Sequence, residues 1–317
     1  MSGVILLTGA SSFTGLWIAE ALAGAGYDVL APLRGARDDY GGVRLDRVRR
    51  LGAVAEVAFS CPVASPAMRE LIGAQPRIDA LAHHAAEIAG YRDPGFDAST
   101  AVARNLEGTL PFLRRLCERG AGVMLATATV FEAGEGGEGP SAPAVMPYGL
   151  SKTLTNTALD HYAAWAGLRF GKFVIPSPYG PFEEKRFGWH LFSNWFAGTV
   201  PVVRTPLYIR DHLPAPLLAR AYAAHLTDLL IDPLSPGVRR PSGWIAPQGE
   251  FGRRVAAEAA RRLGRDCPLE FNAQQSFEEP AVRVNSEPCA EIPWDEATFW
   301  DDYVDWYQAL YDQGAFG

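Results

Sequence analysis

The sequence has few lysines, few cysteines and no long apolar run. Three lysines stand among its 317 residues, so arginine supplies nearly all of the positive charge. The four cysteines are widely spaced and form no C-x-x-C pair, which argues against a disulfide framework or a zinc site and suits a reducing compartment. No apolar stretch approaches the roughly 20 residues of a membrane span. We therefore expect a cytoplasmic protein that has no membrane contact and binds no metal.

An excess of positive charge is also absent. The formal net charge is −7 and the isoelectric point is about 5.4, which argues against nucleic acid or an anionic membrane as the main partner. A phosphorylated substrate stays open, because a few local arginines can bind one. With 48% hydrophobic residues, the chain is long enough for one large α/β unit or two packed domains.

Short apolar runs alternate with helical patterns through the first half of the chain. We expect strands at 3–8, 27–33, 54–59, 78–82, 123–126 and 170–175, with helices at 16–23, 101–119 and 148–166 between them. This alternation predicts βαβ units and a doubly wound parallel sheet with helices on both faces. From residue 176 onward prolines and aromatics become frequent and the alternation stops.

A glycine-containing turn joins the first expected strand to the first helix. Gly9 would permit a tight turn and Gly15 a close approach of helix to strand, where a dinucleotide pyrophosphate meets the helix N-terminus. Ser12 takes the middle position, where glycine is usual, so the fingerprint is imperfect and an ordinary βα turn stays the alternative. The candidate cofactor-binding residues of the turn are Gly9, Ser11, Ser12, Phe13, Thr14 and Gly15.

The end of the second strand indicates the type of dinucleotide. An acidic residue there would bind the ribose of NAD, whereas an arginine accommodates the 2′-phosphate of NADP. The chain has Arg34 and then Arg37, with no carboxylate before Asp38. NADP(H) is therefore favoured and NAD stays possible. The alternative is that both arginines are merely exposed loop charges.

Tyr148 and Lys152 are four residues apart on an expected helix and so share one face. A nearby ammonium would lower the pKa of the phenol toward the range useful for acid–base catalysis. The spacing alone is also typical of a solvated helix face.

Taken in order, these motifs resemble the extended short-chain dehydrogenase/reductase family, in particular its nucleotide-sugar epimerases and reductases. The resemblance covers nearly the whole chain. Its motifs are TGASSFTG at 8–15, DALAHHAA at 79–86, NLEGT at 105–109, ATATVF at 126–131, YxxxK at 148–152, YGP at 179–181 and RD at 210–211.

The resemblance implies roles for individual residues. Thr127 would act with Tyr148 and Lys152 as the catalytic set. Further cofactor contacts would come from Ala85, Ala86, Asn105 and Lys152. The substrate contacts implied are Thr129, Ser177, Arg210 and Arg283, with Ser177 standing where the family often has asparagine.

The resemblance also implies the architecture. We expect a Rossmann-type dinucleotide-binding domain at 1–175, joined by 207–232, and a smaller C-terminal substrate-binding domain at 176–206 and 233–317. The partner would be a nucleotide-diphosphate sugar. Relatives often form homodimers through the helices that begin near Asn105 and Tyr148 here, so a homodimer is expected, with possible contributions from Ala158, Leu159 and Tyr162.

The function implied is NADPH-dependent reduction of a keto group, expected at C4, on a nucleotide-linked sugar. Tyr148 would protonate the alkoxide, Thr127 would polarise the carbonyl, and Lys152 would lower the tyrosine pKa and bind the nicotinamide ribose. One alternative is a 4-epimerase with tightly bound NAD, and another is a non-catalytic dinucleotide sensor. Ala128 and Thr129 replace the Asp-Glu pair of the family's 4,6-dehydratases, and Glu132 follows too late to act instead, so elimination is not expected.

Three segments have less specific interpretations. His83 and His84 are expected to be packed residues at a strand end. The glycine- and glutamate-rich segment 132–143 is expected to be a surface loop. The aromatic segment 189–196 would either line the substrate pocket or form a helix packed on the core.

Overall fold

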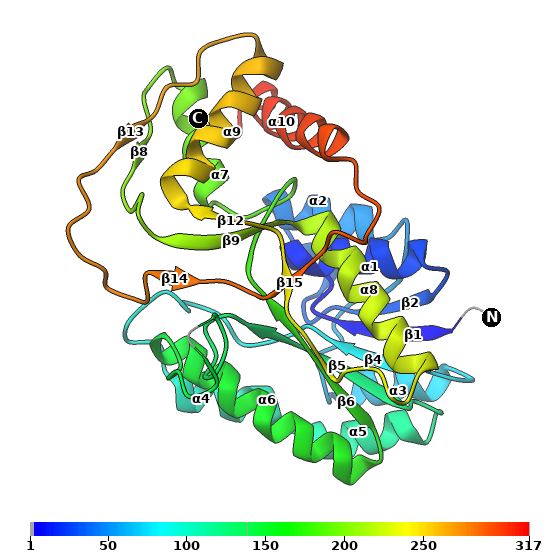
Figure 1. Ribbon diagram of the computed structural model, residues 1–317. Helices are drawn as coiled ribbons and strands as arrows, with labels where there is room; N and C mark the ends of the chain where they lie inside the picture. The colour runs from blue at the N-terminus through cyan, green and yellow to red at the C-terminus, as the bar shows by residue number, and fades with distance from the viewer. Residues whose placement is uncertain (1–2, 138, 317) are drawn as a thin grey trace.

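The protein is built on one parallel sheet. The computed structural model describes residues 3–137 and 139–316. Within them, seven strands pair in the order β10-β6-β5-β4-β1-β2-β3, all in parallel (Figure 1). The expected Rossmann-type sheet is confirmed. Its strands are β1 (Val4–Thr8), β2 (Asp28–Pro32), β3 (Glu56–Ala58), β4 (Ala80–His83), β5 (Val123–Thr129), β6 (Arg169–Ile175) and β10 (Val238–Arg239).

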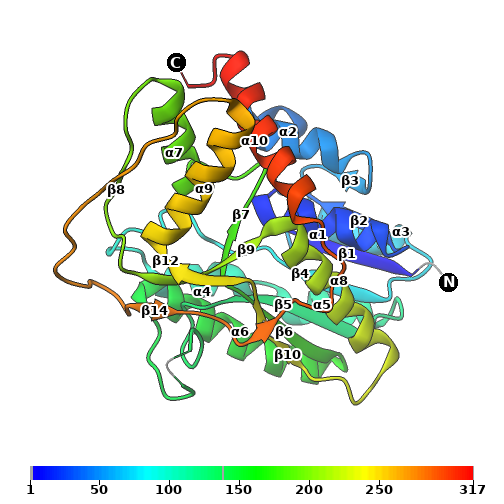
Figure 2. The same cartoon turned by 45° about the horizontal axis from the view of Figure 1, so that its top comes forward.

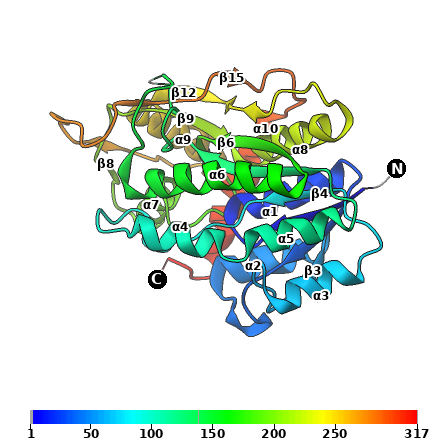
Figure 3. The ribbon, with the colours of Figure 1, turned by 90° about the horizontal axis from the view of Figure 1, so that it is seen from below.

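Helices cover both faces of this sheet because its central strands are apolar on both sides. Every residue of β4 and β5 is buried. One face packs against α1 (Phe13–Gly24), α2 (Gly42–Leu51) and α8 (Ala215–Ile231). The other face packs against α3 (Pro66–Ala74), α5 (Thr109–Cys117) and α6 (Met146–Ala166), and Figure 3 shows α5 and α6 side by side on it.

The helical pattern at 101–119 is interrupted, contrary to expectation. The chain forms α4 (Ala98–Leu106) and then α5, because Gly108 between them adopts a left-handed φ of +66°. A Cβ at Gly108 would also come within 2.9 Å of the Ala64 Cβ. Helix α3 was not expected; Ser65 caps it by accepting the N–H of Met68, and Pro66 is its first residue.

A second, smaller group of elements lies at one end of the sheet (Figures 1 and 2). Its sheet contains β7 (Ser177–Tyr179), β9 (Ile209–Pro214), β12 (Trp244–Pro247) and β14 (Val282–Arg283), with β9 in the middle. The helices of this group are α7 (Phe187–Phe196), α9 (Gln248–Leu263) and α10 (Glu296–Asp312). The remaining short elements are η1 (Arg37–Asp39), β8 (Val202–Val203), β11 (Pro241–Ser242), β13 (Glu270–Phe271) and β15 (Glu287–Pro288).

Aromatic side chains form the core of this second group. The ring of Phe192 in α7 stacks on Tyr307 of α10 with a centroid distance of 4.0 Å. Trp195 is buried in the same cluster. Of the two interpretations of segment 189–196, the helix packed on the core is therefore confirmed.

Two elements bear on how the chain divides into domains. Helix α8 belongs to the core around α1, within the range 207–232 that was expected to join the first domain. The short strand β10 pairs with β6 as an edge of the main sheet, although it falls in the range 233–317 expected for the second domain. The exact division stays a prediction.

Neither a membrane span nor a metal cluster is found in the described residues. None of the helices there combines the length and apolarity that crossing a bilayer requires. No group of three or more His, Cys, Asp or Glu side chains in residues 3–137 and 139–316 is arranged to hold a metal ion.

Candidate active site

The turn between β1 and α1 needs both of its glycines. Gly9 has a φ of +74°, and a Cβ on it would lie 2.8 Å from the backbone nitrogen of Ala85. A Cβ on Gly15 would lie 2.2 Å from the carbonyl oxygen of Gly9. Ser12 caps α1, its Oγ accepting the N–H of Gly15 at 3.1 Å. This close-packed helix N-terminus suits a dinucleotide pyrophosphate, because the first N–H groups of a helix have no partner within it.

The segment that follows β4 is held beside this turn by Thr8. The Thr8 Oγ1 accepts the backbone N–H groups of His84 and Ala85, each at 3.1 Å. It also lies 3.1 Å from Nδ1 of His83. Burial lowers the pKa of His83 to about 4, so His83 is a packed, neutral residue of the strand end, as expected. Ala85 and Ala86 consequently lie at the edge of the turn.

Asn105 fixes the loop after β4 from the other side. Its Oδ1 accepts the backbone N–H of Glu87 at 2.7 Å. Its Nδ2 donates to Thr155 Oγ1 of α6 at 3.3 Å. Asn105 therefore joins the loop at the cofactor turn to the helix that carries Tyr148 and Lys152.

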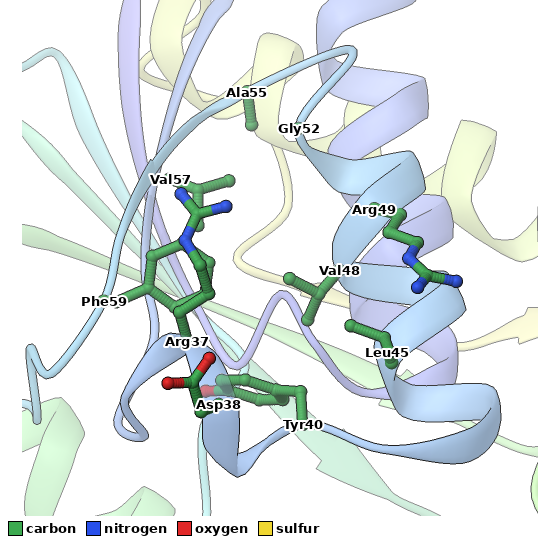
Figure 4. A pocket seen from close by; sticks show the side chains of 10 residues that line it. All are labelled: Arg37, Asp38, Tyr40, Leu45, Val48, Arg49, Gly52, Ala55, Val57 and Phe59. Atoms are coloured by element: carbon green, nitrogen blue, oxygen red, sulfur yellow. The ribbon is translucent and has the colours of Figure 1, made fainter.

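The two arginines after β2 separate instead of forming one site. The Arg34 side chain is 79% exposed, and its nearest carboxylate is Glu87 at 3.8 Å. The Arg37 guanidinium lies over the Phe59 ring, 4.7 Å from its centroid. Figure 4 shows Arg37 and Phe59 across from Val48 of α2, at a hollow of about 650 Å³. Arg34 is thus the candidate nearer the loop after β4, and Arg37 lies on the α2 side.

Thr127 and Lys152 come together at the carboxyl end of β5. The strand continues three residues beyond the expected end at Ala126 and includes both Thr127 and Thr129. The Lys152 Nζ donates to the Thr127 carbonyl oxygen at 2.8 Å. Burial lowers the pKa of Lys152, and the Glu132 carboxylate opposes that shift.

Tyr148 lies one helical turn before Lys152, near the start of α6, among three aromatic rings. The centroids of Tyr91, Phe131 and Phe96 are 5.1, 5.9 and 6.3 Å from its own. Burial, followed by the Glu132 carboxylate, raises the pKa of Tyr148. The expected lowering by Lys152 is wrong for the free protein, because these aromatic surroundings and a nearby negative charge disfavour the phenolate.

Glu132 is a buried part of this site, although the segment 132–143 was expected to be a surface loop. Its side chain is 1% exposed, and its Oε1 accepts from the Thr129 N–H at 3.1 Å and from Asn156 Nδ2 at 2.8 Å. Its Oε2 lies 3.0 Å from Lys172 Nζ. The loop turns inward because this lysine offers an ion pair within the core. Thr129 is therefore held through its backbone to Glu132.

Arg210 and Arg283 are neighbours on paired strands. β9 and β14 align them directly opposite each other, and Glu279 Oε1 accepts from both guanidinium groups, at 2.8 and 2.9 Å. Burial, followed by Arg210, lowers the pKa of Arg283 to about 10. Among the described residues, Nε and Nη1 of Arg283 have no hydrogen-bond partner despite their burial. This unpaired donor set suits an anion.

Phe131 connects these arginines to the catalytic candidates. The Arg283 guanidinium lies 3.7 Å from the Phe131 ring centroid, and that ring packs edge-on against Tyr148. Ser177 lies farther along, in β7, where it pairs with His212 of β9. Phe131 therefore lies between Tyr148 and Arg283, while Lys152, one helical turn after Tyr148, contacts Thr127.

Three residues that take part in the candidate site were not identified from the sequence. His84 was treated as a packing residue, yet its ring bonds to the turn and to Thr127. Glu132 follows too late in the chain to replace the dehydratase carboxylates, and no further role was expected for it. Glu279 stands four residues before Arg283, and that spacing is the one signal that could have indicated an ion pair.

Residues 5–228 match the model of the NAD dependent epimerase/dehydratase family, which is more than half of the chain. No curated protein sequence matches it.

Solved structures share the fold at low sequence identity. A UDP-glucuronic acid 4-epimerase from Bacillus cereus, in complex with UDP-glucuronic acid and NAD, has a TM-score of 0.71 at 17% identity, over 97% of this chain and 100% of that chain. A UDP-glucose 4-epimerase from Thermotoga maritima has a TM-score of 0.70 at 18% identity, over 97% of this chain and 99% of that chain. A dTDP-glucose 4,6-dehydratase from Streptomyces venezuelae has a TM-score of 0.69 at 18% identity, over 98% of each chain. Because the family model matches more than half of the chain and includes the cofactor turn, Thr127, Tyr148 and Lys152, the protein belongs to the NAD-dependent epimerase/dehydratase family.

Proposed function

We propose that the protein reduces a keto group, expected at C4, on a nucleotide-linked sugar with NADPH. The observation that carries this proposal is the meeting of Lys152 with Thr127 at the carboxyl end of β5. That end of the sheet also holds the Gly9–Gly15 turn, and it is where ligands bind in open parallel sheets. The similar structures are epimerases and a dehydratase that act on UDP- or dTDP-linked sugars by their names.

The residues of the turn fit a dinucleotide. The close approach of Gly9 and Gly15 to neighbouring backbone keeps the turn tight. A pyrophosphate would lie against the α1 N–H groups, with further contacts from Ser11, Ser12, Phe13 and Thr14. A bound nicotinamide supplies the hydride; the protein supplies binding, orientation and electrostatics. Ala85 and Ala86 present no bulky side chain on the opposite side, and Lys152 would bind the nicotinamide ribose.

Tyr148 would give its proton to the substrate oxygen while Thr127 holds that oxygen. A phenol whose pKa is raised stays protonated at neutral pH, which is the form that donates during reduction. An epimerase begins in the opposite sense, by taking a proton from a sugar hydroxyl, and needs the phenolate first. The protonated form of Tyr148 is thus the one that a reductase uses first.

Arg210 and Arg283 would bind the diphosphate of the nucleotide. Arginine matches phosphate oxygens with two parallel N–H donors, and Arg283 has donors without partners among the described residues. Phe131 would keep this anion site next to Tyr148. Thr129 and Ser177 are the further candidates for sugar contacts.

The choice of NADPH rests on Arg34, which stands where an NAD enzyme has a carboxylate. The similar epimerase from Bacillus cereus was solved with NAD, so the second candidate function is a 4-epimerase with tightly bound NAD. Protein purified with firmly held NAD, and with no net consumption of NADPH, would favour that second function.

The test is a screen of nucleotide-linked 4-keto and 4-hydroxy sugars, following NADPH absorbance and product stereochemistry. We expect a 4-keto sugar to be reduced. Tyr148→Phe should lower the rate on the order of 10²–10⁴-fold with unchanged cofactor affinity, and Tyr162→Phe, in the same helix, should be near wild type. If no such sugar reacts or binds, or if Tyr148→Phe keeps near-full activity, the proposal is overturned.

We also propose a homodimer through α5 and α6, the helices that begin near Asn105 and Tyr148. Leu150, Leu154 and Trp165 of α6 are exposed, at 46%, 47% and 64%, and would be covered in a dimer. Leu159 was expected to contribute to this face but is 1% exposed within its own core. A native mass measurement of wild type and Leu154→Glu would decide, since a dimer through this face should dissociate in the variant.

A further inference from the structure

The ring of His84 joins the cofactor turn to the catalytic threonine. Its Nδ1 lies 2.8 Å from Thr127 Oγ1 at the end of β5. Its Nε2 lies 2.9 Å from Thr14 Oγ1 and 3.1 Å from Ser12 Oγ in the turn before α1. The backbone N–H of His84 is held by Thr8. A side chain fixed at both ring nitrogens between two functional segments has more constraints than core packing needs.

His84 is a neutral imidazole at pH 7. Burial, followed by the nearby Lys152 ammonium and then His83, lowers the pKa of His84 to about 3. A neutral imidazole has one N–H donor and one acceptor nitrogen. The partner at one nitrogen therefore decides the direction of the hydrogen bond at the other.

The hydroxyl groups of the turn favour a His84 ring whose Nε2 carries no proton and accepts a hydrogen bond. Ser12 Oγ already accepts the N–H of Gly15, so its own O–H proton is free to be donated. Thr14 offers a second hydroxyl at hydrogen-bond distance from the same nitrogen. With Nε2 accepting, the ring proton is on Nδ1 and is donated to Thr127 Oγ1.

We propose that His84 is a positioning residue that holds the Thr127 hydroxyl with its own proton free for the substrate oxygen. This inference rests on the proposed function. A Thr127 that accepts from His84 can donate to a carbonyl, which is the polarising contact that a reduction needs. With the opposite tautomer, the Thr127 hydroxyl would donate its proton to His84 Nδ1. It could then only accept a hydrogen bond from the substrate.

The first test does not depend on catalysis. Nitrogen-15 NMR of the cofactor-free protein at pH 7 reports the tautomer of each of the six histidines, and the signals of His84 are identified by their loss in His84→Asn. We expect the proton on Nδ1, and a shift of that signal in Thr127→Val. Thr157→Val is the matched control, because Thr157 is exposed and its hydroxyl donates to the Thr153 carbonyl within α6. A proton on Nε2, or a signal indifferent to Thr127→Val, overturns the proposal.

The second test separates positioning from packing. His84→Asn keeps an N–H donor near the place of Nδ1, whereas His84→Phe keeps a ring and has no donor. We expect His84→Phe to lower kcat on the order of 10- to 100-fold with KM for sugar and cofactor changed only a few-fold, and His84→Asn to restore most of kcat. Equal losses in the two variants, or a loss confined to cofactor affinity, contradict the role. Should wild-type protein reduce no nucleotide sugar, the proposed function fails while the NMR result still decides the link between His84 and Thr127.

Discussion

The two pairs of arginines assigned to anions lie in opposite surroundings. Arg34 and Arg37 follow β2 on the surface, where Arg34 has only a distant carboxylate and Arg37 lies on an aromatic ring. Arg210 and Arg283 are buried, aligned by strand pairing and joined by one shared carboxylate. Both arginines of the first pair are exposed, whereas both arginines of the second pair are buried.

This difference in burial indicates how each pair of arginines would bind its anion. A buried guanidinium has already lost its hydration and its side-chain entropy, so an incoming anion gains a strong interaction at little further ordering cost. An exposed arginine must be ordered and partly dehydrated when the ligand arrives. We therefore expect the buried pair to dominate substrate affinity and the exposed pair to adjust cofactor choice.

The largest effect should come from Arg283→Met, which keeps an unbranched apolar side chain and removes the guanidinium charge. We expect the affinity for UDP or dTDP to fall on the order of 10²-fold, because removing one member of a buried, hydrogen-bonded charge set costs roughly 2–5 kcal/mol. Isothermal titration calorimetry with UDP or dTDP measures this affinity.

The matched control is Arg262→Met. Its side chain is 9% exposed and bonds two carboxylates in α9 and α10, away from β9 and β14. Equal losses of nucleotide affinity in both variants would mean that burial, and not position, explains the effect.

A smaller effect is expected for Arg34→Leu. NADPH affinity should fall about tenfold, or ~1.4 kcal/mol, with little change for NADH, because an exposed charge is screened by solvent. Fluorescence titration with both cofactors measures the ratio. Arg104→Leu loses a similar contact to the same Glu87 carboxylate and should keep the wild-type ratio. An unchanged ratio in Arg34→Leu would make Arg34 an ordinary surface charge.

The smallest effect should come from Glu279→Gln. The carboxylate bonds both buried arginines and so competes with a phosphate for them. Its neutral isostere should raise the affinity for pyrophosphate or UDP roughly three- to tenfold. Weaker binding in Glu279→Gln would show instead that Glu279 orients the arginines for the ligand.

Much of this molecule could be predicted from its sequence. The strands of the main sheet follow from apolar runs bounded by glycine, and the turn follows from Gly9 and Gly15. Thr127, Tyr148 and Lys152 were selected by their order in the chain, and Thr127 and Lys152 are in contact. Arg210 and Arg283, 73 residues apart in number, are adjacent in β9 and β14.

What could not be predicted depends on side chains meeting across the fold. Glu132 was expected at the surface because its segment is polar, and it is buried because Lys172 of β6 pairs with it. The pKa of Tyr148 depends on rings from the loop after β4, whose path has no periodic pattern. His84 resembled a packing residue because its partners come from two distant segments. In each case the decisive neighbour is remote in sequence.

The central claim is that hydride moves from NADPH to a sugar carbon beside Tyr148. The direct measurement uses NADPH in which both hydrogens at C4 of the nicotinamide are deuterium. It is supplied with a nucleotide-linked 4-keto sugar, and the product is analysed by mass spectrometry and NMR. We predict one deuterium at C4 of the product sugar in wild-type protein and almost none with Tyr148→Phe. A product without deuterium, formed while NADPH is not consumed, would contradict the account.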